Sequence, residues 1–93
     1  MTHTLIIYDI TDDKIRMKIA TACKTAGLIR IQKSAFLGKI NSQERKNLKK
    51  RLKRTLGKNK GNIQIFLICE ADMKLREIIG ELIKYEEEEI MII

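Results

Sequence analysis

The sequence has few of the residues that most often carry chemistry. It contains one histidine, His3, no proline, and two cysteines, Cys23 and Cys69. His3 lies beside the N-terminus, where we expect it to be exposed, so histidine acid–base catalysis is not indicated. The cysteine spacing fits neither a metal site nor a disulfide framework. We therefore expect two reduced core thiols in a cytoplasmic protein, and no thiol nucleophile.

Long apolar runs are also missing. The run Leu5–Tyr8 is too short for the apolar region of a signal peptide, and it ends at the charged Asp9. No stretch is long enough to form a transmembrane helix. We therefore expect no association with a membrane.

Aromatic side chains are scarce, yet the chain is apolar enough to fold. The four aromatic residues are Tyr8, Phe36, Phe66 and Tyr85. So few aromatics argue against a plain RNA-binding module that stacks bases on its sheet. Apolar residues still make up 44% of the 93 residues, which is enough for one globular domain with a thin core. A thin core favours burial against a second copy.

Positive charge is concentrated in one segment. The net charge is +7, and the pI is near 9.6. Between Glu44 and Lys60 there are nine basic residues and one acid, which is +8 in that segment alone. Unmixed positive charge repels itself, so we interpret the segment as a phosphate-binding surface, with a solvated helix face as the alternative. The candidate nucleic-acid-binding residues in it are Lys46, Lys49, Lys50, Lys53 and Arg54.

Hydrophobic periodicity predicts six elements in one domain, 1–93. They are a strand over 4–10, a helix over 12–26 capped by Thr11, two strands within 28–40 that turn near Lys33–Ser34, a helix over 42–56 capped by Asn41 or Ser42, and a buried strand over 63–69. The order strand–helix–strand–strand–helix–strand predicts a ferredoxin-like α/β sandwich, βαββαβ.

The last part of the chain gives an ambiguous pattern. Residues 73–84 fit helical spacing, but 76–79 also fit a short strand that ends at Gly80. Residues 81–93 form a C-terminal extension, and its apolar end, 90–93, is expected to add a strand to a partner subunit or to dock another protein.

Asp9 lies where the first strand meets the first helix, an edge at which α/β proteins often place a site. A turn-forming or capping aspartate is the simpler alternative. One carboxylate is too little for Mg²⁺, which prefers several oxygen ligands. A two-fold dimer would bring two copies of Asp9 to one cleft, where a bound metal could polarise a phosphate and activate water.

Three segments resemble the CRISPR-associated Cas-two family. They are residues 7–13, Ile-Tyr-Asp-Ile-Thr-Asp-Asp; Arg16 and Lys18 on the helix that follows; and residues 27–38, with a glycine, an arginine, a glutamine, a serine and a phenylalanine at the family spacing. The resemblance spans about residues 4–80. It implies a ferredoxin-like homodimer with C-terminal strand additions, and a strand near 75–79.

The resemblance also implies a function and roles for residues. Family members are described as Mg²⁺- or Mn²⁺-dependent endonucleases on single-stranded RNA or double-stranded DNA. In spacer acquisition the dimer bridges integrase (Cas-one) dimers. By position, Asp9 would be the catalytic metal ligand and Tyr8 would flank it. The remaining positions are Arg16, Lys18 and Arg30 as phosphate contacts and Phe36 as a lining of the site or the dimer interface.

Some alternatives stay open at this point. Lys18 stands where the family often has arginine, and a lysine lacks the bidentate geometry for phosphate. Core packing is the alternative for Tyr8 and Phe36. The competing functions are a non-catalytic dimeric adaptor that holds duplex DNA on the basic helix 42–56, and an RNA-cleaving toxin-like protein on the same fold.

Overall fold

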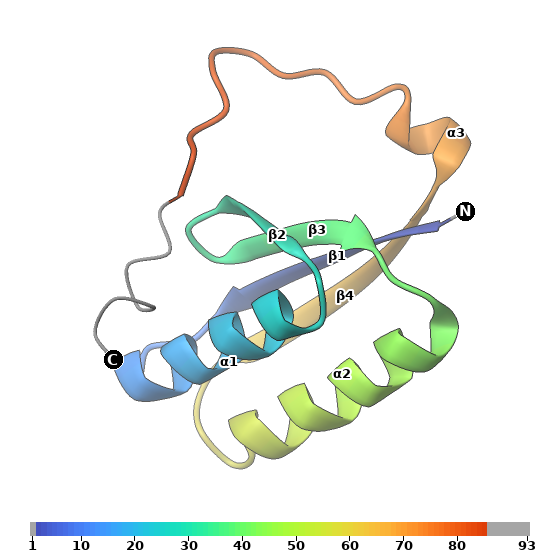
Figure 1. Ribbon diagram of the computed structural model, residues 1–93. Coiled ribbons are helices and arrows are strands. Elements are labelled where there is room, and N and C mark those ends of the chain that lie inside the picture. Colours follow the sequence, from blue (N-terminus) through green and yellow to red (C-terminus); the bar gives the residue numbers. More distant parts are fainter. Residues whose placement is uncertain (1, 86–93) are drawn as a thin grey trace.

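A computed structural model describes residues 2–85. Its elements confirm the predicted βαββαβ order (Figure 1). In chain order they are β1 (Thr2–Asp9), α1 (Asp13–Thr25), β2 (Ile29–Gln32), β3 (Ala35–Lys39), α2 (Ser42–Leu56), β4 (Asn62–Cys69) and the single-turn α3 (Glu70–Met73). The turn predicted at Lys33–Ser34 separates β2 from β3.

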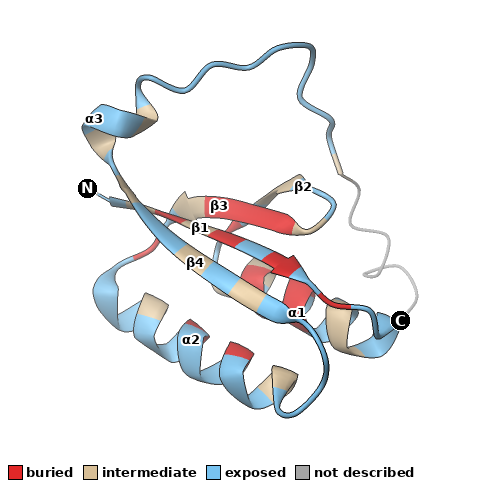
Figure 2. Cartoon of the chain, turned by 180° about the vertical axis from the view of Figure 1, so that it is seen from behind, coloured by how far each residue is buried: buried red, intermediate tan, exposed pale blue. Residues whose placement is uncertain are grey.

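The four strands form one antiparallel sheet in the order β2-β3-β1-β4, with α1 and α2 packed on one face (Figure 1). Side chains alternate between the two faces of a strand. Ile6 and Tyr8 of β1 are buried on the helix-covered face. Leu5, Ile7 and Asp9 therefore lie on the other face, which we call the open face. It is the face turned toward the viewer in Figure 2.

The core lies between the helices and the sheet. Ile6 and Phe36 from the sheet and Ile19 and Leu52 from the helices are fully buried. Burying each such side chain stabilises the fold by about 1.5–3 kcal/mol. Leu48, Leu52 and Leu56 recur at four-residue spacing and form a leucine stripe along α2, and Leu48 and Leu52 of this stripe are buried in the core.

Capping residues set the helix starts. Asn41 caps α2 in a reciprocal capping box: its Oδ1 accepts from Glu44 N at 2.7 Å, and Glu44 Oε1 accepts from Asn41 N at 2.8 Å. The cap predicted at Thr11 for the first helix is wrong. Asp12 is the cap, and its Oδ1 accepts from Ile15 N at 2.9 Å. Aspartate is the stronger cap, and its charge also suits the positive helix end.

The prediction that the last strand is buried is wrong for the single chain. Among the described residues, β4 pairs with β1 alone and therefore lies at the edge of the sheet. Phe66 is 45% exposed and Leu67 is 55% exposed, and most of β4 carries the exposed and intermediate colours in Figure 2. The sequence shows a strand's apolar residues but not whether a neighbour covers them.

Residues 74–85 form neither the helix nor the strand that the patterns allowed. Leu75 is 76% exposed and Ile79 is 99% exposed, so this part of the apolar stripe finds little to pack against among residues 2–85. A helix of this length needs such packing, because its intrinsic stability is marginal in water. The described part of the extension therefore adds no strand to the sheet, and residues 86–93 lie outside the described residues. Within 2–85 no helix is long and apolar enough to cross a membrane.

Candidate functional site

Asp9 ends β1 on the open face, opposite Asn62 of β4, and its side chain is exposed. Gly61, just before β4, packs tightly on its backbone. A Cβ built on Gly61 would lie 2.5 Å from the carbonyl oxygen of Asp9 and 3.1 Å from Ile10 Cα. Gly61 also has φ +124°, which side-chain-bearing residues rarely adopt. Glycine at this position therefore lets the loop after α2 hold the end of β1 in place.

Arg16 fastens the segment that follows Asp9. Its Nη1 donates to the carbonyl oxygens of Ile10 at 3.1 Å and Thr11 at 3.3 Å. Its Nη2 pairs with the carboxylate of Asp13. The guanidinium thus holds the turn between β1 and α1 together through hydrogen bonds and an ion pair. The resemblance implied a phosphate contact for Arg16; the structure shows that it also positions the Asp9 segment.

Tyr8 and Asp9 lie on opposite faces of the sheet. Tyr8 is 3% exposed, and its ring stacks on Phe36 with centroids 6.4 Å apart. The resemblance implied that Tyr8 flanks the aspartate. Within a single chain the two are neighbours in sequence, but their side chains point to opposite sides of the sheet, because strand residues alternate between its faces. Phe36 is fully buried and belongs to the core, so in this chain it lines neither an open cleft nor an exposed surface.

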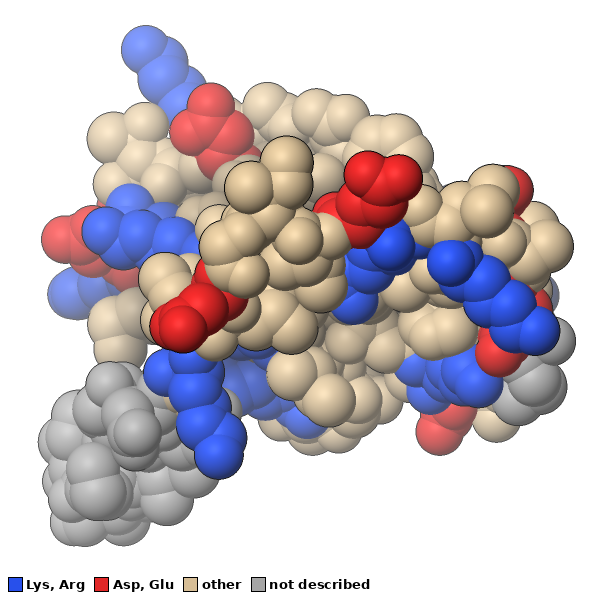
Figure 3. All heavy atoms as spheres, turned by 90° about the horizontal axis from the view of Figure 1, so that it is seen from above, with Lys and Arg blue, Asp and Glu red and all other residues tan. Residues whose placement is uncertain are grey.

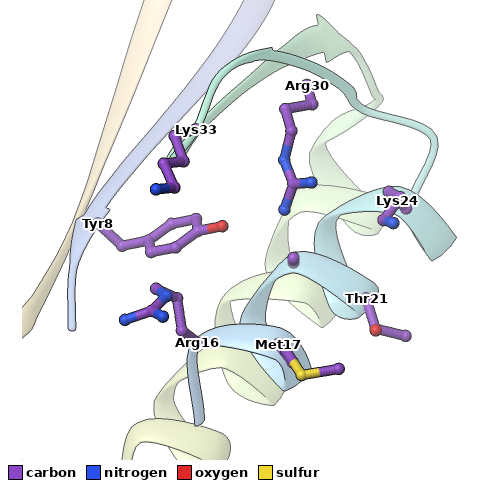
Figure 4. Close-up of a pocket in the computed structure, with 8 residues that line it drawn as sticks. Tyr8, Arg16, Met17, Thr21, Lys24, Arg30 and Lys33 are labelled. Atoms are coloured by element: carbon purple, nitrogen blue, oxygen red, sulfur yellow. The ribbon is translucent and has the colours of Figure 1, made fainter. Parts of the chain in front are cut away.

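A cationic pocket surrounds the Tyr8 hydroxyl on the helix-covered face (Figure 4). Arg30 reaches it from β2, with Cζ 5.0 Å from the ring centre of Phe36, and Lys33 reaches it from the β2–β3 turn. Arg16 also lines it. Burial raises the pKa of Tyr8, and the hydrogen bond and positive charge that Arg30 supplies oppose that rise. The hydroxyl is thus protonated and available as a donor at neutral pH.

A single chain offers little to a metal ion. Among residues 2–85, no group of three or more histidine, cysteine or acidic side chains is placed to hold one. Asp12 caps α1 and Asp13 pairs with Arg16, so both carboxylates already have partners. Asp9 is exposed at the edge of the open face and can supply one carboxylate. It fits a hard divalent ion only as part of a larger set of oxygen ligands.

The basic segment forms the exposed side of α2. Leu48 and Leu52 face the core. The predicted contacts Lys46, Lys49, Lys50, Lys53 and Arg54 are all exposed. The surface on the side away from α2, shown in Figure 3, mixes both signs of charge.

Lys18 belongs to this basic helix layer rather than to the surroundings of Asp9. It lines a groove between α1 and α2 that also includes Lys14 and Arg51. The predicted site residues therefore separate into three places: Asp9 on the open face, Tyr8 and Arg30 in the cationic pocket, and Lys18 with the α2 cations.

Comparison with known proteins assigns the chain to a family. The model described as "CRISPR associated protein Cas2" matches residues 1–76. The chain belongs to this family. A Korarchaeum cryptofilum relative named CRISPR-associated endoribonuclease Cas2 is 47% identical over 76 residues, which is 82% of each chain. A Thermoproteus tenax protein named CRISPR-associated endonuclease Cas1/endonuclease Cas2 fusion is 35% identical over 66 residues, 71% of this chain and 25% of the fusion.

Solved structures support the Cas2 fold. Streptococcus pyogenes Cas2 at pH 6.5 has a TM-score of 0.72 with 23% identity, covering 84% of this chain and 99% of that chain. A chain of a partial Cas6-RT-Cas1–Cas2 complex has a TM-score of 0.65 with 25% identity, covering 85% of this chain and 91% of that one. These structures confirm the ferredoxin-like fold that the sequence predicts.

Sequence reasoning missed two residues of the Asp9 region and its neighbouring pocket. Gly61 carries no assignment from the sequence, although a glycine at a strand is a signal for close backbone approach. Lys33 was noted only as part of a turn. Its nearness to Tyr8 follows from a hydrogen bond from Tyr8 N to the carbonyl of Ser34 at 3.0 Å, which no local pattern reveals.

Proposed function

We propose that two copies of the chain pack their open faces together and form a metal-dependent endonuclease with both Asp9 carboxylates at its centre. The observation that carries the proposal is the position of Asp9, exposed at the end of an apolar sheet face. Ile7 is 39% exposed and Phe66 is 45% exposed on that face. Removing such apolar surface from water favours association.

The paired carboxylates suit Mg²⁺ or Mn²⁺, which would polarise a phosphate oxygen and lower the pKa of a bound water. In this chain, Asp9 supplies the ligand oxygens. Gly61 packs against the Asp9 carbonyl and Arg16 holds the carbonyls of Ile10 and Thr11, so the backbone that carries the carboxylate is already fixed before a ligand binds. Preorganisation of this kind lowers the cost of reaching the reactive geometry.

We infer that the substrate is a phosphodiester of single-stranded RNA or double-stranded DNA, handled during CRISPR spacer acquisition in the cytoplasm. Relatives named endoribonuclease favour RNA. The Cas1/Cas2 fusion and the complex that contains Cas1 and Cas2 favour the Cas1 integrase as a partner.

The test is cleavage of labelled single-stranded RNA and double-stranded DNA with Mg²⁺, with Mn²⁺ and with chelator. Asp9→Asn is expected to abolish metal-dependent cleavage and to leave folding intact. Asp12→Asn is the matched control, because asparagine caps a helix as well as aspartate does. Cleavage by Asp9→Asn at the wild-type rate would refute the assignment.

A second function is favoured by the positive charge of α2, where the single acid Glu44 faces a large excess of cations. In this role the dimer is a non-catalytic adaptor that holds duplex DNA against its basic helices while it contacts integrase subunits. The adaptor role is tested by reversing the charge of four exposed cations of α2: Lys49, Lys50, Lys53 and Arg54. Duplex binding and its steep salt dependence are expected to disappear. Reversal of Lys74 and Arg76, two exposed cations that follow α3, is the control. Spacer acquisition that survives the α2 reversal would contradict the adaptor role.

A further inference from the structure

The cationic pocket beside Tyr8 is a site of its own. It is a cavity of about 200 Å³ between the end of β1, α1 and the β2–β3 turn. Tyr8 contributes to it from the helix-covered face, whereas Asp9 lies on the open face, so the sheet separates the pocket from the carboxylate. The pocket therefore does not share a ligand atom with Asp9 in the same chain.

The lining of the pocket consists of hydrogen-bond donors and apolar surface. Four cations line it, and within the described part of the chain no acidic residue does. These cations are Arg16, Lys24, Arg30 and Lys33. Met17 and Ala20 of α1 supply apolar surface. A cavity with this lining favours an anion attached to a small, less polar group.

Two of the donors are buried without an acceptor. The Tyr8 O–H and Arg30 Nε have no acceptor among the described residues, although Tyr8 is only 3% exposed. Arg30 can donate only to the Tyr8 oxygen, which leaves the hydrogen of the hydroxyl unpaired. Buried polar groups are nearly always hydrogen-bonded, because leaving one unpaired costs free energy. A hydroxyl directed into a cation-lined cavity is therefore a group that a ligand would satisfy.

The donors are also held in place before any ligand arrives. Tyr8 is fixed by stacking on Phe36 and by the bond from its backbone N to Ser34. Arg30 lies between two rings, with Cζ 5.0 Å from the centre of Phe36 and 5.9 Å from that of Tyr85. Figure 4 shows Arg30, Lys33 and Arg16 surrounding the Tyr8 ring. Such preorganisation reduces the entropy lost on binding.

We propose that this pocket binds a phosphomonoester through the Tyr8 hydroxyl, Arg30 and Lys33. A phosphomonoester carries about −1.5 to −2 charges at neutral pH and three strong acceptor oxygens, which matches a cluster of donors. Its terminal position lets it enter a cavity, whereas a phosphodiester is continued by the backbone on both sides. The phosphate comes from the end of a nucleic-acid strand or from a free nucleotide. The proposal does not depend on the chemistry at Asp9.

The test measures binding by Asp9→Asn protein in chelator, so that no cleavage interferes. Fluorescent single-stranded oligonucleotides of one sequence carry either a terminal phosphate or a terminal hydroxyl, at the 5′ end in one pair and at the 3′ end in another. Tyr8→Phe removes the hydroxyl and keeps the ring. Tyr85→Phe is its matched control, since it removes the other tyrosine hydroxyl of the chain. Lys33→Gln is compared with Lys58→Gln, a change in the exposed loop after α2.

The phosphorylated strand is expected to bind about tenfold tighter than the hydroxyl strand, a difference of about 1.4 kcal/mol. Tyr8→Phe and Lys33→Gln are each expected to remove most of that preference. Tyr85→Phe and Lys58→Gln are expected to retain the preference for the phosphorylated strand. Lys58→Gln can weaken the binding of both strands, but it should do so equally. Thermal unfolding establishes that each variant is folded.

Adenosine monophosphate distinguishes the two sources of the phosphate. If it displaces the phosphorylated strand at a concentration near the strand's own Kd, the pocket takes a free nucleotide. If displacement needs a far higher concentration of adenosine monophosphate, the pocket binds the phosphate at the end of a strand. Equal affinity for the two strands, or a preference that persists in both Tyr8→Phe and Lys33→Gln, would overturn the proposal. Displacement by an acidic peptide but not by any phosphate would overturn it as well.

Discussion

Replacing Gly61 by alanine tests whether the loop after α2 positions Asp9. The added Cβ would lie 2.5 Å from the Asp9 carbonyl oxygen, and ordinary contact begins at 3.4 Å, so the two backbones must separate by about 0.9 Å. The φ of +124° adds strain of order 1–3 kcal/mol. We therefore expect Gly61→Ala to lower the free energy of unfolding by about 2–4 kcal/mol.

Gly80→Ala is the matched control for this change. Gly80 also has positive φ, +93°, but a Cβ there would meet nothing within 4 Å. It lies in a segment without regular structure, so the strain can relax, and we expect a loss below about 1 kcal/mol. Urea unfolding of the three proteins, at matched pH and salt, measures the difference.

The same pair of variants separates stability from activity. A displacement near 1 Å at a reacting group can cost about 100-fold in rate. Metal-dependent RNA cleavage, measured well below the melting temperature, should fall by about that factor in Gly61→Ala and stay near wild type in Gly80→Ala. Wild-type stability and cleavage in Gly61→Ala would refute the view that this contact holds Asp9 in place.

Two further predictions concern α1. Arg16→Gln is expected to reduce stability by about 1–2 kcal/mol and to lower cleavage, because it frees the segment after Asp9; Lys18→Gln should change only the salt dependence of nucleic-acid binding. Urea unfolding and salt titrations of nucleic-acid binding are measured for both variants. Equal losses of stability and of cleavage in Arg16→Gln and Lys18→Gln would contradict the positioning role of Arg16. Burial raises the pKa of the Cys23 thiol to about 12 from 9.0, so the unfolded chain loses its proton first and stability falls from about pH 9 upward. Between pH 8 and 10 the wild type should lose about 1 kcal/mol more than Cys23→Ala in urea unfolding.

Local patterns predicted most of the fold because each element carries its own signal. The leucine stripe and the Asn41 cap define α2, and the polar turn at Lys33–Ser34 divides the second β region into two strands. The cap of α1 was assigned to Thr11 because threonine and aspartate at adjacent positions both suit an N-cap. Only the backbone geometry shows that Asp12 holds that position.

The errors arose where burial depends on partners distant in sequence. The apolar residues of β4 predict a strand, but its place at the sheet edge follows from pairing with β1. Residues 74–85 have an apolar stripe at helical spacing. Among the described residues, β2 lies beside the end of this stripe, at Leu82 and Ile83, and both stay largely exposed. Tertiary contacts decide the structure of such a segment, because its local preference is weak.

The candidate site was located in part. Asp9 was recognised at a strand end, and its exposure on the open face agrees with that interpretation. The resemblance implied that Tyr8 flanks it, whereas the two-residue period of a strand puts the two side chains on opposite faces of one chain's sheet. The contacts of Arg16 with Ile10 and Thr11 and the approach of Gly61 to Asp9 are backbone contacts, and composition and spacing do not reveal them.

The central claim is that two chains share one divalent ion through their Asp9 carboxylates. The most direct test is a titration of Mn²⁺ into the wild-type protein and into Asp9→Asn, followed by electron paramagnetic resonance, with the mass of each protein in solution determined in parallel. The account predicts one bound Mn²⁺ per two wild-type chains, and no specific binding by an Asp9→Asn protein that remains dimeric. One Mn²⁺ per chain, or unchanged binding by Asp9→Asn, would contradict it.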